Sequence, residues 1–283
     1  MRPLVDWPLA ERRQLIGVFT DIDDTLTTDG AITADALQAL GALQAAGRHV
    51  IAITGRPIGW SEPFARGDAT RGIAPWPVDA IVAENGAAAF ACLNLHVKGL
   101  QPTPLLHSPL SKLYQQDAAI RAANYTRLQT VAAQVLREVP GAALATDSAG
   151  RETDIAIDHS EFAQLAPAQI AQVVALLTGA GMTASVSSIH INGWLGEHNK
   201  LSGARWIVRE LFDRDLDAEL NRWAFVGDST NDQLMFEHFR HSVGVANVRR
   251  FEAELSHPPR YIAQGARGAG FAEVARAILD AKD

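Results

Sequence analysis

Four short groups of polar residues interrupt otherwise apolar segments of this chain. They are Asp21-Ile-Asp23-Asp-Thr25, Thr54-Gly55-Arg56, Lys200 and Gly227-Asp228-Ser-Thr-Asn231-Asp232. Three of the four directly follow a short apolar run, which is the pattern of a strand buried on both faces. If these strands belong to one parallel sheet, their carboxyl ends bring the polar groups to one edge, where ligands of such sheets bind.

The acidic members of these groups predict a metal site. Several carboxylates that converge on one place repel one another unless a cation lies among them. Oxygen ligands without a His or Cys partner favour Mg²⁺. Beside such a cation, an Asp can attack phosphorus and form an aspartyl-phosphate, which divides a difficult hydrolysis into two easier steps.

Each group taken singly also has an ordinary explanation. Asp-x-Asp-Asp-Thr is a common acidic loop, a Thr after a strand is often a helix cap, and a single Lys is usually solvated. The occurrence of all four groups in order at strand ends favours the chemical interpretation.

The elements that must position these groups alternate between strands and helices. We expect core strands at residues 16–20, 49–54, 79–83 and 223–227, and further short strands at 242–245 and 261–262. Apolar residues at helical spacing predict helices at 33–47, 201–212 and 271–281. This alternation implies right-handed crossovers and a parallel sheet in an α/β fold.

The pattern changes between residues 88 and 194. Helices are expected there at about 112–138 and 165–178, and short strands at 142–146, 153–157, 182–187 and 188–193. This order indicates a separate antiparallel α+β layer. We therefore divide the chain into a first core part (1–87), an inserted α/β cap (88–194) and a second core part (195–283).

The motifs and their order resemble those of the haloacid dehalogenase superfamily. The groups at Asp21, Thr54, Lys200 and Asp228 resemble its first to fourth motifs. Glu84-Asn-Gly-Ala87 is similar to a further element of subfamily IIB, in which an α/β cap of the C2B type is inserted between motifs two and three. The resemblance implies a Rossmann-like core with a parallel sheet and an inserted α+β cap domain.

The same resemblance implies a role for each matched residue. Asp21 would be the nucleophile, and Asp23 the acid that protonates the leaving alkoxide and then the base that activates water. Thr54 would hydrogen-bond a phosphoryl oxygen, and Lys200 would neutralise developing charge. The expected Mg²⁺ ligands are Asp21, Asp23 through its carbonyl, and Asp228, with Asn231 or Asp232 in support.

The candidate substrate-binding residues lie on both core and cap. They are Gly55, Arg56 and Asn85 on the core, and His190, Asn192 and Trp194 on the segment that leads back to Lys200. Polar tips with an aromatic face suit a sugar. Arg151, Glu152 and Asp154 are weaker candidates, and ordinary cap surface is the alternative for all the cap residues.

Caps of this subgroup accompany sugar-phosphate phosphatases, and the chain resembles sucrose-phosphate, trehalose-phosphate and mannosyl-3-phosphoglycerate phosphatases. The resemblance implies a Mg²⁺-dependent phosphoric monoester hydrolase that acts on a small phosphorylated metabolite, a sugar phosphate. A phosphosugar mutase similar to phosphomannomutase is the alternative. A non-enzymatic phospho-receiver or binding module is a third hypothesis, although receivers are single domains of less than half this length.

Composition excludes other classes of function. The 283 residues carry a formal net charge of -7, which argues against nucleic acid or anionic lipid as a partner. Cys92 is the only cysteine, so an intramolecular disulfide and a thiolate metal cage are excluded. No secretory signal and no apolar run of roughly 18 residues is present. We expect a soluble cytoplasmic protein, and the oligomeric state is left open.

Three other patterns are assigned no chemistry. His238 and His241 lack the partners of a zinc-protease motif, so surface or capping roles are expected. Residues 265–270 are expected to form a loop rather than a dinucleotide-binding turn. Residues 196–200 lack the glycine spacing of a P-loop.

Overall fold

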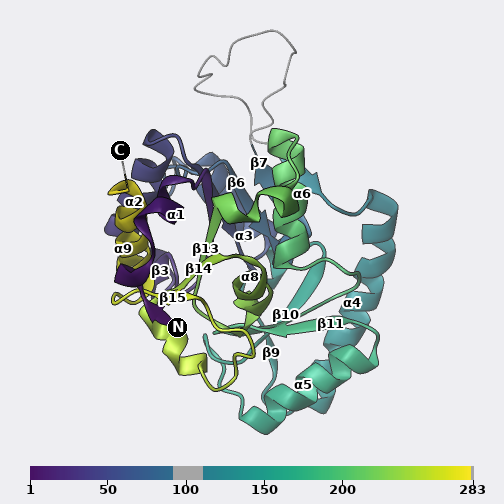
Figure 1. The fold of residues 1–283 in the computed structure, drawn as a ribbon. Coiled ribbons are helices and arrows are strands. Elements are labelled where there is room, and N and C mark those ends of the chain that lie inside the picture. Colours follow the sequence, from purple (N-terminus) through teal and green to yellow (C-terminus); the bar gives the residue numbers. More distant parts are fainter. Residues whose placement is uncertain (92–110, 282–283) are drawn as a thin grey trace.

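The computed structural model describes residues 1–91 and 111–281, so Cys92 lies outside the described residues (Figure 1). The strands are β1 (Arg2–Pro3), β2 (Gly17–Thr20), β3 (Thr27–Thr28), β4 (Ala31–Ile32), β5 (His49–Ile53), β6 (Ala80–Ala83), β7 (Ala88–Ala91), β8 (Ser111–Tyr114), β9 (Ala143–Leu144), β10 (Asp154–Asp158), β11 (Thr183–Val186), β12 (His190–Trp194), β13 (Trp223–Gly227), β14 (His241–Gly244) and β15 (Tyr261–Ile262).

The α-helices are α1 (Leu9–Arg13), α2 (Ala34–Ala45), α3 (Ile58–Arg66), α4 (Ala118–Glu138), α5 (Pro167–Gly179), α6 (Lys200–Phe212), α7 (Leu216–Glu219), α8 (Gln233–His238) and α9 (Arg267–Leu279). Short 3₁₀ helices are η1 (Leu4–Asp6), η2 (Glu84–Gly86), η3 (Ser148–Gly150), η4 (Leu220–Arg222), η5 (Thr230–Asp232) and η6 (Ala246–Phe251).

The larger sheet has the strand order β1-β15-β14-β13-β2-β5-β6-β7-β8. Neighbouring strands from β1 to β6 in this order are parallel, and β7 and β8 are added antiparallel at one edge. The expected α/β core with a parallel sheet is therefore confirmed. Strands β13, β2 and β5, which carry three of the four polar groups at their ends, are adjacent in the sheet.

Alternate strand residues build two hydrophobic layers, one on each face of this sheet. Val18 packs in the layer covered by α2, α3 and α9, whereas its neighbour Phe19 packs in the layer covered by α6 and α8. Both side chains are fully buried. Burial on both faces explains why these strands have uninterrupted apolar sequences, as parallel sheets require.

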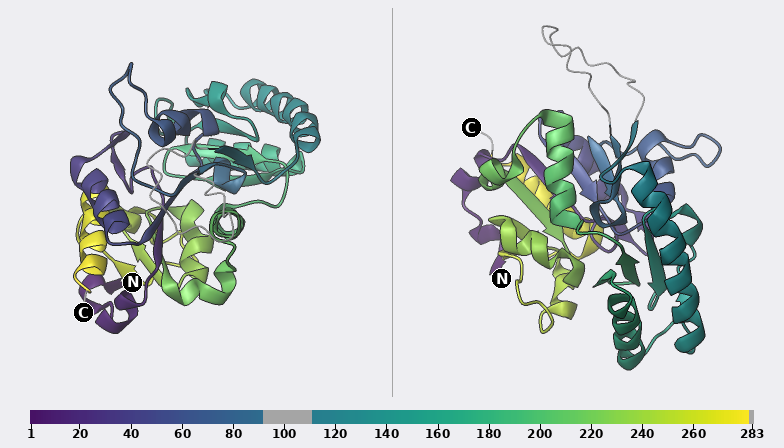
Figure 2. Two further views of the ribbon diagram at one scale, coloured as in Figure 1. Left: turned by 90° about the horizontal axis from the view of Figure 1, so that it is seen from above. Right: turned by 90° about the vertical axis from the view of Figure 1, so that its right-hand side faces the viewer.

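The second sheet is antiparallel, with the order β11-β12-β10-β9, and it carries α4 and α5. Leu128 of α4, Leu177 of α5 and Ile157 of β10 share a separate hydrophobic core. Figure 2 shows this layer as a second lobe beside the core. We call the lobe formed by residues 118–194 the cap.

The start of the inserted segment differs from the expectation. Residues 111–114 form β8 rather than the first turn of a helix, and α4 begins only after Asp117, whose side chain accepts a 2.9 Å hydrogen bond from Ile120 N. Strands β7 and β8 extend the larger sheet, although the sequence places both in the cap segment. Pairing between distant strands outweighs local helical spacing here.

Two further expectations are wrong. The loop expected at 265–270 contains the first turn of α9, in which a Cβ on Gly268 would lie 2.0 Å from Thr33 Oγ1, so close packing explains the glycine. His241 is buried rather than on the surface, because it starts β14 and receives a 3.2 Å hydrogen bond from Trp7 Nε1. His238 is exposed on α8, and its Nδ1 contacts the Leu234 carbonyl at 2.9 Å.

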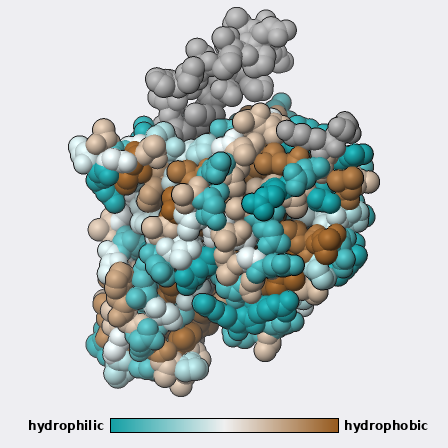
Figure 3. Space-filling view, turned by 90° about the vertical axis from the view of Figure 1, so that its left-hand side faces the viewer, coloured by the Kyte–Doolittle hydropathy of each residue, from teal (hydrophilic) through white to brown (hydrophobic). Residues whose placement is uncertain are grey.

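No helix in the described part of the chain could span a membrane. Within residues 1–91 and 111–281, each helix is too short or too polar to cross a bilayer. On the face that carries α2 and α9, small hydrophobic patches alternate with hydrophilic residues (Figure 3).

Candidate active site

The carboxyl ends of β2, β5 and β13 bring the first, second and fourth polar groups together. Asp21 N donates to Val226 O of β13 at 2.8 Å, which fixes the turn after β2. Thr54 N donates to Val82 O of β6 at 2.9 Å, which continues the ladder one residue beyond β5. Asp21, Thr54 and Asp228 are all buried.

Lys200 joins this group from the first residue of α6. Asn199 caps that helix by accepting a 2.9 Å hydrogen bond from Ser202 N, which holds the helix start in place. Lys200 Nζ donates to Asp21 Oδ1 at 2.6 Å and to Asp232 Oδ1 at 2.7 Å. Burial lowers the pKa of Lys200, but the two carboxylates raise it by more, so the amine stays charged.

Three carboxylates form a compact oxygen cluster. One oxygen each from Asp21, Asp228 and Asp232 lies within 4.8 Å of the others. Burial, followed by the charges of Asp21 and Asp232, raises the pKa of Asp228, and burial raises the pKa of Asp21 although Lys200 opposes this effect. One lysine thus leaves negative charge uncompensated, and the hard oxygen donors fit Mg²⁺.

The remaining expected ligands lie close by but are engaged differently. Asp232 Oδ2 accepts from Asp228 N at 2.9 Å, so this carboxylate is held by Lys200 and the backbone. Asn231 Oδ1 accepts from Ser229 Oγ at 2.9 Å. A side chain that the sequence analysis missed, Asn247, donates to Asp228 Oδ2 at 2.9 Å. It follows β14, so the rule of polar residues at strand ends could have found it.

Arg56 connects the core to the cap. Its guanidinium donates to Asp23 Oδ1 through Nε at 3.0 Å and through Nη2 at 2.9 Å. It also donates to Asp147 Oδ2 at 3.0 Å and Glu161 Oε1 at 2.9 Å, both on the cap. Asp23 therefore shares one buried cation with two cap carboxylates, neither of which the sequence analysis identified. We call these contacts the Arg56 clasp.

Glu84 makes a second connection between core and cap. Its fully buried carboxylate accepts from Ile58 N on the core, and from Glu152 N and Thr153 N on the cap, at 2.5–3.1 Å. Glu84 and Asn85 both have positive φ, of 49° and 54°. The buried Asn85 amide nitrogen has no hydrogen-bond partner within the described residues.

The expected cap residues divide into two groups. His190 Nε2 contacts Glu161 Oε2 at 2.9 Å, and Asn192 Nδ2 donates to Asp154 Oδ2 at 3.0 Å; both residues line the cavity beside Asp21. Trp194 instead donates to the His198 carbonyl at 2.8 Å and lines a neighbouring cleft with Asn85 and Lys200.

The weaker candidates, Arg151, Glu152 and Asp154, mainly bond to other protein groups. Arg151 is buried against Asp154 at 2.8 Å and donates to the Gly55 carbonyl at 3.0 Å. Glu152 pairs with Lys112 and accepts from Tyr114 Oη at 2.5 Å, away from Asp21.

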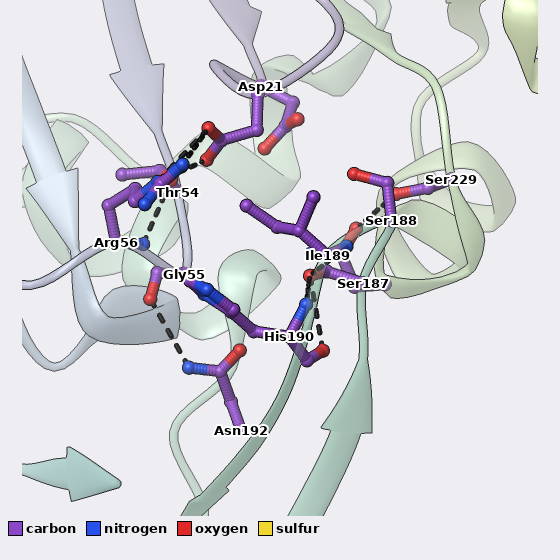
Figure 4. A pocket seen from close by; sticks show the side chains of 12 residues that line it. Asp21, Thr54, Gly55, Arg56, Ser187, Ser188, Ile189, His190, Asn192 and Ser229 are labelled. Atoms are coloured by element: carbon purple, nitrogen blue, oxygen red, sulfur yellow. Dashed lines mark hydrogen bonds and ion pairs between the residues drawn. The ribbon is translucent and has the colours of Figure 1, made fainter. Parts of the chain in front are cut away.

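The cavity beside Asp21 is closed by a cap loop that the sequence analysis missed. Eight of the expected site residues line it, namely Asp21, Asp23, Thr54, Gly55, Arg56, His190, Asn192 and Asn231. Ser229 after β13 and three residues between β11 and β12, Ser187, Ser188 and Ile189, complete the lining. Figure 4 shows Ile189 between Thr54 and Ser229, below Asp21. The enclosed space is about 10 Å³, which is room for a single water.

Part of the chain is similar to a known protein family. Residues 18–129 match a family model described as haloacid dehalogenase-like hydrolase. No curated protein sequence matches the chain significantly.

Solved structures share the fold over almost the whole chain. Sucrose-phosphatase from Synechocystis sp. PCC6803, in complex with sucrose and phosphate, is 16% identical with a TM-score of 0.61, covering 94% of this chain and 98% of that one. The subclass IIB sugar phosphatase BT4131 is 15% identical with a TM-score of 0.58, covering 93% and 98%. Thermoplasma acidophilum 0175 is 15% identical with a TM-score of 0.63, covering 94% and 98%. The family match thus covers residues 18–129, and the fold of nearly the whole chain is shared with these solved structures.

Proposed function

We propose that the chain is a Mg²⁺-dependent phosphatase that hydrolyses a phosphate monoester, a sugar phosphate, through an aspartyl-phosphate on Asp21. The observation that carries the proposal is the Lys200 ammonium, bonded at 2.6 Å to Asp21 within a cluster of three buried carboxylates. The similarity to structures of sugar phosphatases supports the leaving group as a sugar.

In the first step, an Asp21 carboxylate oxygen attacks phosphorus, and the bond from phosphorus to the leaving oxygen breaks. Asp23 gives its proton to that oxygen, so the leaving group departs as an alcohol. Lys200 holds Asp21 in position and offsets charge on the transferring group, while Thr54 donates to a phosphoryl oxygen. Mg²⁺, held by Asp21, Asp228 and the Asp23 carbonyl, would screen the phosphate charge.

In the second step, water attacks the phosphorus of the aspartyl-phosphate. Asp23 takes the water proton, the bond to the Asp21 oxygen breaks, and inorganic phosphate leaves. While the cap is closed, the Arg56 clasp keeps Asp23 beside this reaction site. Since the closed cavity has room for only one water, we propose that the cap opens to admit substrate and release product.

The experiment is a screen of phosphorylated metabolites and p-nitrophenyl phosphate for phosphate release, with Mg²⁺ present and after chelation. We expect release that depends on Mg²⁺ and is greatest for sugar phosphates. The Asp21→Asn variant should lose at least about 10³-fold in turnover because its amide is a poor nucleophile. Retained turnover in Asp21→Asn would contradict the role of Asp21 as the nucleophile. Interconversion of hexose phosphates without phosphate release would support a mutase instead.

A further inference from the structure

A cleft of about 730 Å³ between core and cap is lined by Asp23 but not by Asp21. Its volume lies in the range of small-molecule sites. Asp23 and Arg56 line both this cleft and the cavity of Asp21. Because a general acid must touch the leaving oxygen, the leaving group has to lie on the Asp23 side, in this cleft.

The charges around the cleft are paired with one exception. Asp23 and Glu161 share Arg56, and both bonds measure 2.9 Å. Asp24 and Asp29 pair with Arg267 at 2.9 and 3.0 Å. The other lining arginine, Arg250, is exposed and has no ion pair among the described residues.

Arg250 is held in a defined position relative to the reaction site. It belongs to η6, and Asn247 of that helix donates to the Asp24 carbonyl at 3.0 Å and to Asp228 Oδ2 at 2.9 Å. Asn247 Oδ1 also accepts from Arg267 N at 2.9 Å. Helix η6 is thus bonded to the segments that contain Asp24 and Asp228. The backbone of Arg250 is therefore held in place, so its guanidinium can reach a ligand from a defined position.

The cap side of the cleft is equally well built. Asp158 accepts hydrogen bonds from four consecutive backbone amides, of residues 160–163, at 2.8–3.1 Å. The loop held in this way presents Phe162, which is 73% exposed, to the cleft opposite Arg250 and Phe251. Two aromatic faces suit the carbon skeleton of a sugar or related chain.

Resting on the proposed phosphatase activity, we propose that this cleft binds the leaving group and that Arg250 binds a second anionic group on it, a carboxylate or a phosphate. The substrate class is therefore a phosphate monoester of an acidic or doubly phosphorylated polyol or sugar. A guanidinium binds either anion through paired, charge-assisted hydrogen bonds.

The test compares matched substrates that differ in the second anion. The carboxylate pairs are 3-phosphoglycerate against glycerol 3-phosphate, and 6-phosphogluconate against sorbitol 6-phosphate. The phosphate pair is fructose 1,6-bisphosphate against fructose 6-phosphate. We expect kcat/KM to favour the doubly anionic member of at least one pair by about tenfold or more, and the arm that responds tells carboxylate from phosphate.

The Arg250→Gln variant should bring that ratio close to one, mainly through a higher KM for the doubly anionic compound. Arg249→Gln is the matched control, since Arg249 lies next in the same helix, pairs with Glu252 and does not line the cleft. Arg249→Gln should show the same ratio of kcat/KM within each substrate pair as the unchanged protein. Equal kcat/KM within every pair, or a preference that survives Arg250→Gln, would overturn the subsite alone. If no compound releases phosphate, p-nitrophenyl phosphate included, both the phosphatase proposal and the proposed subsite are overturned.

Discussion

Lys200 and Asp232 illustrate how single residues hold the site in place. The Asp232 carboxylate uses one oxygen for Lys200 and the other for the Asp228 backbone amide. It therefore links the amine to the turn after β13. Burying the Lys200 ammonium without a carboxylate partner would destabilise the folded state. This explains why Asp232 is fully buried beside it.

A second buried residue, His198, sets a pH dependence of stability. Both ring nitrogens lack partners in the described part of the chain, and burial lowers the pKa of His198 to about 4. An unfolded His has a pKa of about 6.5, so between these values only the unfolded chain binds the proton. The free energy of unfolding should then decrease as pH falls from about 6.5 to about 4, by on the order of 3 kcal/mol from this residue.

Chemical denaturation across that pH range, for the unchanged protein and for His198→Phe, measures the effect. The variant should show a shallower dependence, whereas His257→Gln should not, since His257 is half exposed. Identical slopes for all three proteins would show that His198 does not remain neutral.

At the scale of elements, core and cap meet through several polar contacts. Arg56, Arg151 and Glu84 each bond across the boundary. Polar contacts of this kind can break and form again with water as the alternative partner, so they suit the cap opening that we propose.

The Arg56 clasp makes the position of Asp23 depend on the cap. Glu161→Gln removes one of the two cap carboxylates from Arg56, and we expect kcat/KM to fall about tenfold. The loss should be larger for alkyl phosphates than for p-nitrophenyl phosphate, because only the former need a proton from Asp23.

Steady-state kinetics with both substrate types measures this difference. Glu152→Gln is the control, because its carboxylate pairs with Lys112 away from the clasp. An equal loss for both leaving groups would mean that Glu161 merely packs against Arg56.

Close backbone contact is the second feature of the boundary. A Cβ on Gly59 of α3 would lie 2.8 Å from the Gly150 Cα of the cap. Gly59→Ala favours helix α3 by about 1 kcal/mol but pushes the cap away, so we expect activity to fall about tenfold without lower stability.

Small-angle scattering should show a larger radius of gyration for Gly59→Ala, and kinetics should show the loss. Gly179→Ala, also at a helical glycine but with open space around it, should leave both unchanged. Full activity of Gly59→Ala would show that the contact is not needed for closure.

At the scale of the whole molecule, the proposed cation site joins segments from both parts of the core. Asp21 and Asp228 are separated by most of the chain, yet their oxygens lie in one cluster. A ligand that binds only this assembled cluster stabilises the folded state over the unfolded chain.

Millimolar Mg²⁺ should therefore raise the melting temperature by several degrees if its concentration is about 100 times the dissociation constant. Chelation should reverse the shift, and Asp228→Asn should greatly reduce it. Differential scanning calorimetry measures it without any substrate. A shift that is unchanged in Asp228→Asn would place the cation elsewhere.

The sequence by itself determined the main core strands and the polar residues that lie at their ends. Apolar runs predict buried strands, and polar groups directly after them must lie at one edge of a parallel sheet, so Asp21, Thr54 and Asp228 could be grouped in advance. Helical spacing similarly predicted α2, α5 and α6. These are local signals, each contained within a few neighbouring residues.

Only the tertiary structure decided which distant side chains meet. Nothing beside Glu84 or Glu161 in the sequence reveals that Glu84 bonds to the cap or that Glu161 bonds to Arg56. The pairing of β8 with β7 likewise depends on a strand from another segment. Such partners are set by the packing of the sheet against the cap, because the free energy of a buried polar contact depends on the donor brought to it, whatever its distance along the chain.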